Sequence, residues 1–195
     1  IINVNPDPRY PHPDTFLFPN RCHHMDSFRL DGFTLKGGSF TYINNHYYGG
    51  WGAAIRTDSV NRIILKNLWV DSNTAFLGGG IYIENSAHGW MENVLFTRNN
   101  AQNLGGGTFL SNCRDFKLIN TAFTENIALC EFSSYPPAQI SGGFYFEVGD
   151  YDVHNMTATN NVGEMAGTIN LATVRFYNSI IYPDRINIFY NHDST

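Results

Sequence analysis

Charged residues, and lysine above all, are scarce in this chain. Only three lysines occur (Lys36, Lys66 and Lys117), charged residues make up 15% of the 195, and the formal net charge is −5. An average globular domain has about 25% charged residues. A protein that binds nucleic acid by neutralising phosphates needs a basic balance. The composition therefore excludes nucleic acid as a partner.

Long apolar runs are also missing. No stretch of about 20 apolar residues occurs, so we expect no membrane-spanning segment. No secretory signal is visible, and the chain opens Ile1-Ile2-Asn3 without a Met. This start favours a mature, processed or excised piece.

Cysteine is rare, and its spacing is irregular. Cys22, Cys113 and Cys130 are too few for a disulfide scaffold and too irregular for a zinc site. One disulfide with a leftover thiol and three buried free thiols are both open. We expect no metal and no cofactor.

Helix-forming residues are scarce, whereas 23 Asn, 18 Gly and 15% aromatic residues are present. Asn and Gly are poor inside helices and favoured at turns. The composition excludes a helical bundle and predicts an all-β protein with tight corners.

A Gly-rich segment followed by an apolar run recurs along the chain. It is clearest at 78–83 and 105–110, continues at 142–146 and 166–171, and is preceded by a variant at 52–57. Between these segments, pairs of Asn are six residues apart. The pairs are Asn67 and Asn73, Asn93 and Asn99, Asn120 and Asn126, and Asn155 and Asn161.

Each pair is accompanied by three apolar positions with spacing three, then two. The sets are Leu30/Phe33/Leu35, Leu65/Leu68/Val70, Met91/Val94/Phe96, Leu118/Thr121/Phe123, Val153/Met156/Ala158 and Phe176/Ser179/Ile181. Apolar and polar residues alternate, as in strands. A repeat near 26 residues is too short for a propeller blade. The pattern predicts a parallel β-helix of about six coils over residues 26–195, behind an irregular Pro-rich cap at 1–25.

The regular Asn spacing predicts structural ladders. Asn tolerates the left-handed backbone of a sharp corner, and amides stacked at about 4.8 Å can hydrogen-bond from coil to coil. We therefore assign a structural role to Asn67, Asn73, Asn93, Asn99, Asn120, Asn126, Asn155 and Asn161.

Two groups of motifs resemble known families. The Gly-Gly segments alternating with Phe-x-x-Asn, at Phe96–Asn99 and Phe123–Asn126, resemble the repeats of polymorphic outer-membrane proteins. Residues 30–38 (LDGFTLKGG) are similar to the first coil of pectate-lyase-like right-handed β-helices. The resemblance, over about residues 26–191, implies a right-handed β-helix that is secreted or displayed at a cell surface, as in adhesins and autotransporter passengers.

Candidates for chemistry are few. Asp71, Arg98 and Glu125 occupy comparable outward positions, and we expect a surface charge ladder rather than a catalytic site. Glu147, Asp150 and Asp152 are expected to be loop acids, because the repeated calcium-binding signature is missing. His23 and His24 have no companion ligand, so a metal site there is not expected.

Two long insertions interrupt the repeat, at 39–51 and 130–139, and both leave it at the same corner. Insertions of repeat proteins commonly build the binding face. Their aromatic residues predict a ligand surface walling a groove floored by Phe76, Leu77, Asn103 and Leu104, although the loops could instead cover the flank of the solenoid. The candidate ligand-binding residues are Tyr42, Tyr47, Tyr48, Trp51, Phe132 and Tyr135.

The favoured function is that of a non-enzymatic, secreted or cell-surface module for adhesion or structural recognition, with a protein or glycan as partner. One alternative is a polysaccharide lyase or glycoside hydrolase, which needs two or three acids or bases on one strand face. Another is a filament subunit that self-associates through its coil ends.

Overall fold

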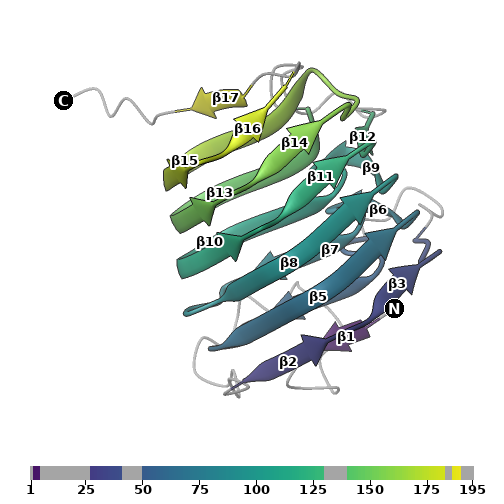
Figure 1. The fold of residues 1–195 in the computed structure, drawn as a ribbon. Helices are drawn as coiled ribbons and strands as arrows, with labels where there is room; N and C mark the ends of the chain where they lie inside the picture. Colours follow the sequence, from purple (N-terminus) through teal and green to yellow (C-terminus); the bar gives the residue numbers. More distant parts are fainter. Residues whose placement is uncertain (1, 5–26, 41–49, 130–139, 183–185, 190–195) are drawn as a thin grey trace, which may run out of the picture.

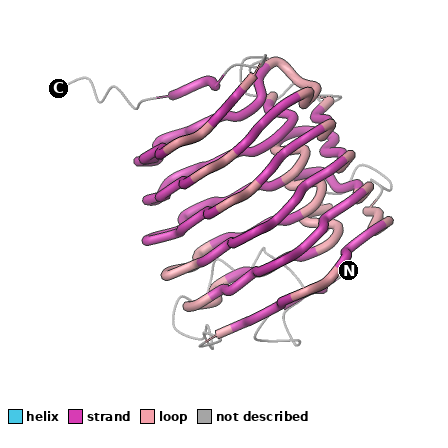
Figure 2. Tube along the Cα trace, viewed as in Figure 1, coloured by secondary structure: helices cyan, strands magenta, loops and turns pink. Residues whose placement is uncertain are grey.

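The computed structural model describes residues 2–4, 27–40, 50–129, 140–182 and 186–189. These residues form strands, turns and loops and no helix (Figure 2). Every strand pairing among them is parallel, in one sheet of 14 strands and one of three (Figure 1). The prediction of an all-β fold with parallel strands is confirmed, and the arrangement is consistent with a β-solenoid.

The first strand row contains the strands of the Gly-rich segments together with β1 and β17, and each strand pairs with the next. They are β1 (Ile2–Val4), β4 (Ile55–Asp58), β7 (Ile81–Glu84), β10 (Thr108–Ile119), β13 (Ser141–His154), β15 (Met165–Tyr177) and β17 (Ile186–Phe189). Residues 2–4 thus belong to a sheet, although we assigned them to an irregular cap. The prolines of that cap begin only at Pro6, so the backbone of 2–4 is free to pair.

The second strand row contains the apolar triplets, and the carboxyl-terminal halves of β10, β13 and β15 run on into it. Its other strands are β2 (Phe28–Asp31), β3 (Thr34–Lys36), β5 (Ile63–Asp71), β8 (Trp90–Thr97), β11 (Ala122–Thr124), β14 (Thr157–Thr159) and β16 (Ile180–Ile181). The third strand row is the short sheet of β6 (Thr74–Leu77), β9 (Asn100–Leu104) and β12 (Ile127–Ala128).

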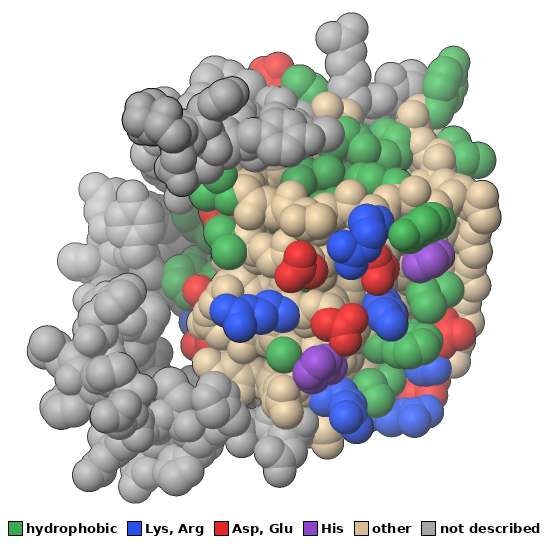
Figure 3. Space-filling view, turned by 90° about the vertical axis from the view of Figure 1, so that its left-hand side faces the viewer, with side chains coloured by type: hydrophobic (Ala, Val, Ile, Leu, Met, Phe, Trp, Pro, Cys, Tyr) green, Lys and Arg blue, Asp and Glu red, His purple; other side chains and the backbone are tan. Residues whose placement is uncertain are grey.

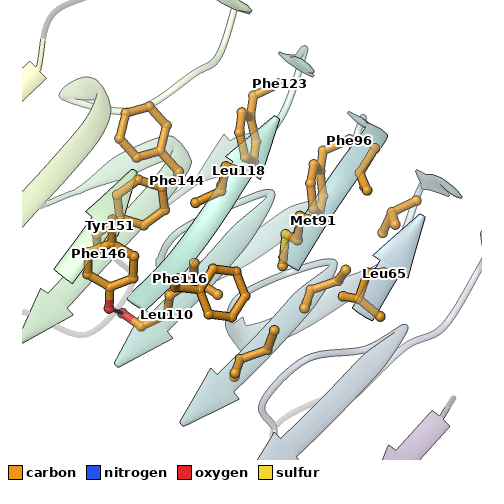
Figure 4. Packing of buried hydrophobic residues seen from close by; sticks show 14 of the residues in the cluster. Leu65, Met91, Phe96, Leu110, Phe116, Leu118, Phe123, Phe144, Phe146 and Tyr151 are labelled. Carbon is orange, nitrogen blue, oxygen red and sulfur yellow. Dashed lines mark hydrogen bonds between the residues drawn. The ribbon is translucent and has the colours of Figure 1, made fainter. Parts of the chain in front are cut away.

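The core lies between the rows and is built from the apolar triplets. Phe96 and Phe123 are fully buried and stack in neighbouring layers, with ring centroids 4.6 Å apart and planes 6° apart (Figure 4). The two residues occupy the same position in consecutive apolar triplets, so the repeat read from the sequence brings them into contact. Phe33 is an exception at 53% exposure, because β2 and β3 pair only with β5 among the described strands and no further described layer covers it.

The Gly runs permit a close approach of neighbouring layers. A Cβ atom on Gly79 would lie 2.3 Å from the carbonyl oxygen of Gly106, and one on Gly106 would lie 2.2 Å from that of Gly142. Larger residues would separate these backbones.

Candidate functional site

The first strand row has an outward face made of two parallel lines of side chains. In β4, Ile55 and Thr57 are buried and alternate with the half-buried Arg56 and Asp58, whereas in β7 only Glu84 is half-buried. The register places Tyr82, Phe109 and Tyr145 in line with Arg56. The strand period of two therefore sets a line of aromatic rings beside a line of polar groups.

The rings form a column that we call the aromatic stack, consisting of Trp51, Tyr82, Phe109 and Tyr145. Successive ring centroids are 5.1, 5.2 and 4.9 Å apart. Tyr82, Phe109 and Tyr145 are buried. Trp51 is half-buried at the end of the stack, and the Arg56 guanidinium lies 4.6 Å from the centroid of its ring. Of the predicted ligand-binding residues, Trp51 thus packs on its own chain.

The other predicted ligand-binding residues lie outside the described residues: Tyr42, Tyr47, Tyr48, Phe132 and Tyr135. Of the predicted groove floor, Asn103 and Leu104 are buried, and Leu104 and Leu77 pack against the aromatic stack. Asn103 and Leu104 therefore do not form an exposed floor. The Gly-rich turn folds them against the rings that follow it.

The polar line beside the stack, which we call the acidic row, consists of Asp58, Glu84, Ser111, Glu147 and Asn170 in consecutive register. All five are half-buried. Ser111 and Asn170 donate hydrogen bonds of 3.0 and 3.2 Å to the two oxygens of Glu147. The Tyr82 hydroxyl donates one of 2.9 Å to Glu84. The strand face thus brings three carboxyl groups together.

Glu84 has the most perturbed carboxyl group of the row. Burial raises its pKa, and the neighbouring charges of Asp58 and Glu147 raise it further, against the lowering effects of the Tyr82 hydrogen bond and Arg56. Burial also raises the pKa of Tyr82 far above its usual range, so its hydroxyl remains a donor. A raised carboxyl pKa of this kind is a property of the general acids of enzymes.

Sequence reasoning missed Asp58 and Glu84 because neither belongs to a motif. The available signal was a repeated position four residues after the last Gly of the run, which Glu84 and Ser111 share. Glu147 was expected in a loop, together with Asp150 and Asp152. All three lie in β13, since the strand continues through the corner where a loop was expected.

The inner Asn column is a buried ladder. The Nδ2 group of Asn73 donates to Oδ1 of Asn99, that of Asn99 to Asn126, and that of Asn126 to Asn161, at 2.9, 2.9 and 3.0 Å. Each of these three Nδ2 groups also donates to a backbone carbonyl of the preceding layer. Each Oδ1 acceptor in turn receives a backbone N–H. The ladder therefore satisfies the buried amides inside the structure.

The outer Asn column is exposed and runs in the opposite direction. Asn67 donates to Asp31, Asn93 to Asn67, Asn120 to Asn93, and Asn155 to Asn120. All four Asn have positive φ, from 51° to 54°, as a corner requires. A further ladder, which the sequence analysis did not identify, joins Asn112 to Asn85 and Asn85 to Asp58.

The expected surface charge ladder is only partly present. Asp71 is fully buried rather than exposed, and it forms ion pairs with Lys36 and Arg98. Although burial raises its pKa, hydrogen bonds from Lys36 and Thr97 and the Arg98 charge lower it overall. Glu125 takes no part in the ion pairs of the described residues. On the face that Figure 3 shows, basic and acidic side chains are intermixed.

The remaining candidates are metal-ligating side chains and the three cysteines. Among the described residues, no three His, Cys, Asp or Glu side chains are placed to hold a metal ion. Cys113 is a buried free thiol whose pKa burial raises to about 12. His23, His24, Cys22 and Cys130 lie outside the described residues.

Comparisons with known proteins give no relative. No protein-family model, no curated protein and no solved structure matches this chain. Within the described ranges, no helix has the length and hydropathy that a membrane crossing requires.

Proposed function

We propose that this chain is a right-handed, pectate-lyase-like β-helix of about six coils, secreted or displayed at a cell surface, whose acidic row recognises an extended glycan. Support for the coil repeat comes from the parallel registers, in which residues 26 or 27 apart in the central layers become hydrogen-bonded neighbours. The resemblance to surface-displayed β-helices supports the handedness and the location.

The acidic row is the observation that carries this function. It presents one polar side chain per layer, at about 4.8 Å per step, beside a rigid aromatic stack. Carboxylates accept hydrogen bonds from hydroxyl groups, and amides both donate to and accept from them. Three acids disfavour a polyanionic ligand. In the sequence, the two insertions precede β4 and β13, which contain Asp58 and Glu147 of the row, and insertions of repeat proteins commonly build the binding face.

A second candidate, hydrolysis of the bound glycan, is favoured by the Asp58 and Glu84 pair. Their strands are in register, which sets the backbones about 4.8 Å apart. Retaining glycosidases hold their two carboxyl groups at about 5 Å, and their acid has a raised pKa. Glu84 would be the acid and Asp58 the nucleophile.

The alternative of a filament subunit that self-associates through its coil ends remains a prediction.

Binding and cleavage are separated by the isosteric variant Glu84→Gln. A module that only binds retains its affinity for neutral polysaccharides within a few-fold and releases no sugar in either form. A hydrolase retains binding but loses about a hundredfold or more of its rate with the variant. Asp115→Asn, which removes an exposed acid paired with His88, is the matched control. If neither neutral nor anionic polysaccharides bind the parent protein, the proposed function is wrong.

A further inference from the structure

The outward face of the second strand row carries two exposed tryptophans, separate from the acidic row. Trp69 on β5 is 41% exposed and Trp90 on β8 is 37% exposed. Trp69 is in register with Leu95 and Trp90 with Ile64. The two rings are thus offset by five residues along adjacent strands and lie on either side of the corner at Asn67 and Asn93.

A buried polar network holds the ring of Trp69. Its indole Nε1–H donates to the Thr97 hydroxyl at 2.7 Å, and this hydroxyl donates to Asp71 at 2.8 Å. Asp71 is fully buried and held by Lys36 and Arg98. An exposed ring with a fixed orientation loses little side-chain entropy when a ligand stacks on it.

Trp90 is held by a different contact. The Lys66 ammonium lies 5.2 Å from the centroid of its ring and also pairs with Glu92. The Lys66 and Glu92 charges offset each other in this ion pair, and Lys117 is the register neighbour of Trp90 on the next strand.

Hydrogen-bonding groups lie between the rings. Asn67 and Asn93 belong to the exposed outer ladder, and they follow Lys66 and Glu92 at the corners of β5 and β8. Within the ladder each amide uses one N–H and one lone pair of its oxygen. An amide has two N–H groups and two lone pairs, so each has capacity left for a ligand.

We propose that Trp69 and Trp90, with the amides of Asn67 and Asn93 between them, form a binding platform for a linear neutral glycan. A sugar chain presents apolar C–H faces to the rings and hydroxyl groups to the amides. A surface that binds a protein partner typically has a contiguous apolar centre from which water is excluded. An extended peptide would need a free strand edge, whereas β5 and β8 are paired on both sides.

The test is calorimetric titration of the whole chain with linear β-glucan, xylan and mannan oligosaccharides of increasing length, and with polygalacturonate. At least one neutral series should bind, with an affinity that rises until a chain reaches both rings. Trp69→Ala and Trp90→Ala should each weaken binding about tenfold, as expected for one lost stacking contact. Polygalacturonate should bind more weakly than the neutral chains.

Matched variants separate loss of the platform from loss of folding. Tyr182→Ala truncates an aromatic side chain that is 71% exposed at the far end of the same row, and it should leave the affinity unchanged. Thr97→Val removes the acceptor of the Trp69 N–H bond and should weaken binding by less than Trp69→Ala. Circular dichroism of all variants checks that the fold is intact.

The platform is refuted if no neutral oligosaccharide series binds, or if both tryptophan variants bind such a series as tightly as the parent protein does. It is also refuted if the two tryptophans are needed only for binding a protein. Binding that is lost with Glu84→Ala but retained with Trp69→Ala and Trp90→Ala takes place at the acidic row, whereas binding that is lost only with the tryptophan variants takes place at the platform. Failure of the platform and failure of the acidic row are therefore distinguishable.

Discussion

Asn99 joins three layers of the structure through one side chain. Its Oδ1 accepts from the backbone and side chain of Asn73, and its Nδ2 donates to the Val70 carbonyl and to Asn126. The residue is fully buried, so water cannot replace these partners. The four hydrogen bonds explain why a polar residue is tolerated beside the core.

Asn99→Ala should lower the free energy of unfolding by roughly 2–4 kcal/mol, because it leaves several buried groups without partners. Asn93→Gly, on the exposed ladder, retains the left-handed backbone and should cost under about 1 kcal/mol. Urea unfolding of both variants measures the difference. Equal losses of unfolding free energy in the two variants would contradict the larger stabilising role assigned to the inner ladder.

Val148 is a residue whose backbone does not suit its side chain. It has φ of 38°, a left-handed conformation that a β-branched residue rarely adopts. The flanking registers place it beside Asn112, which follows Asn85 in the further ladder. An Asn at this position would relieve the strain and could extend that ladder.

Val148→Asn should therefore stabilise the protein by about 1 kcal/mol. The side chain is 43% exposed, so little apolar burial is lost. Val148→Ala, which retains a Cβ atom but cannot form the hydrogen bond, should gain less. Melting temperatures of the parent protein, Val148→Asn and Val148→Ala test this order of stability. A Val148→Asn variant that melts below the parent protein would refute the argument.

Glu84 links the acidic row to stability. Because its pKa in the folded protein is raised above the ordinary value of 4.5, the folded state holds the proton more tightly than the unfolded state. The contribution of Glu84 to stability is then fully present below pH 4.5 and is lost as the pH rises through the folded pKa.

Glu84→Gln removes this titration. The variant should be more stable than the parent protein at pH 7, and the difference should shrink toward pH 4. Denaturant unfolding at both pH values measures it. A parent protein that is the more stable one at pH 7 would contradict the assigned shift.

At the scale of elements, aromatic columns bind the layers of the core. Phe123 stacks on Phe96 in the layer before it and contacts Phe144, with ring centroids 5.6 Å apart. Farther along, Phe146 stacks on Tyr151, whose hydroxyl donates to the Leu110 carbonyl (Figure 4). Each ring therefore contacts its neighbours both within the row and across the core.

Phe123→Ala should cost about 3–5 kcal/mol, as expected for a large-to-small change at a fully buried site. Phe33→Ala, in a half-exposed position of the same repeat, should cost under about 1.5 kcal/mol. Thermal unfolding provides the comparison. A Phe123 variant that melts like the parent protein would contradict the register of the core.

At the scale of the whole molecule, each layer contacts chiefly its two neighbours. Stability in such stacks is approximately a sum of layer and interface terms. The outermost described strands of the second row, β2, β3 and β16, each pair with one strand only. Opening of the stack should therefore begin at its ends.

Hydrogen exchange followed by mass spectrometry tests this expectation. Amides of β8 and of the central part of β10 should exchange slowest, and those of β2, β3 and β16 fastest, because local opening costs least where one neighbour is missing. Uniform protection along the stack would contradict the layer-by-layer description.

The sequence by itself determined the periodic features of this protein. The six-residue Asn spacing, the apolar triplets and the Gly runs each recur once per layer. Their consequences are local, because a corner needs a left-handed residue and a strand alternates its faces wherever it lies. The all-β fold, the parallel pairing and the stacking of Phe96 on Phe123 could be predicted for this reason.

The tertiary structure decided which non-repeating residues meet. Asp58, Glu84 and Glu147 share no motif, and steps of unequal length separate them along the chain. Only the pairing register places them in one row. Burial of Asp71 likewise depends on Lys36 and Arg98 from neighbouring layers. Contacts between layers depend on register, and register is fixed by packing of the whole stack.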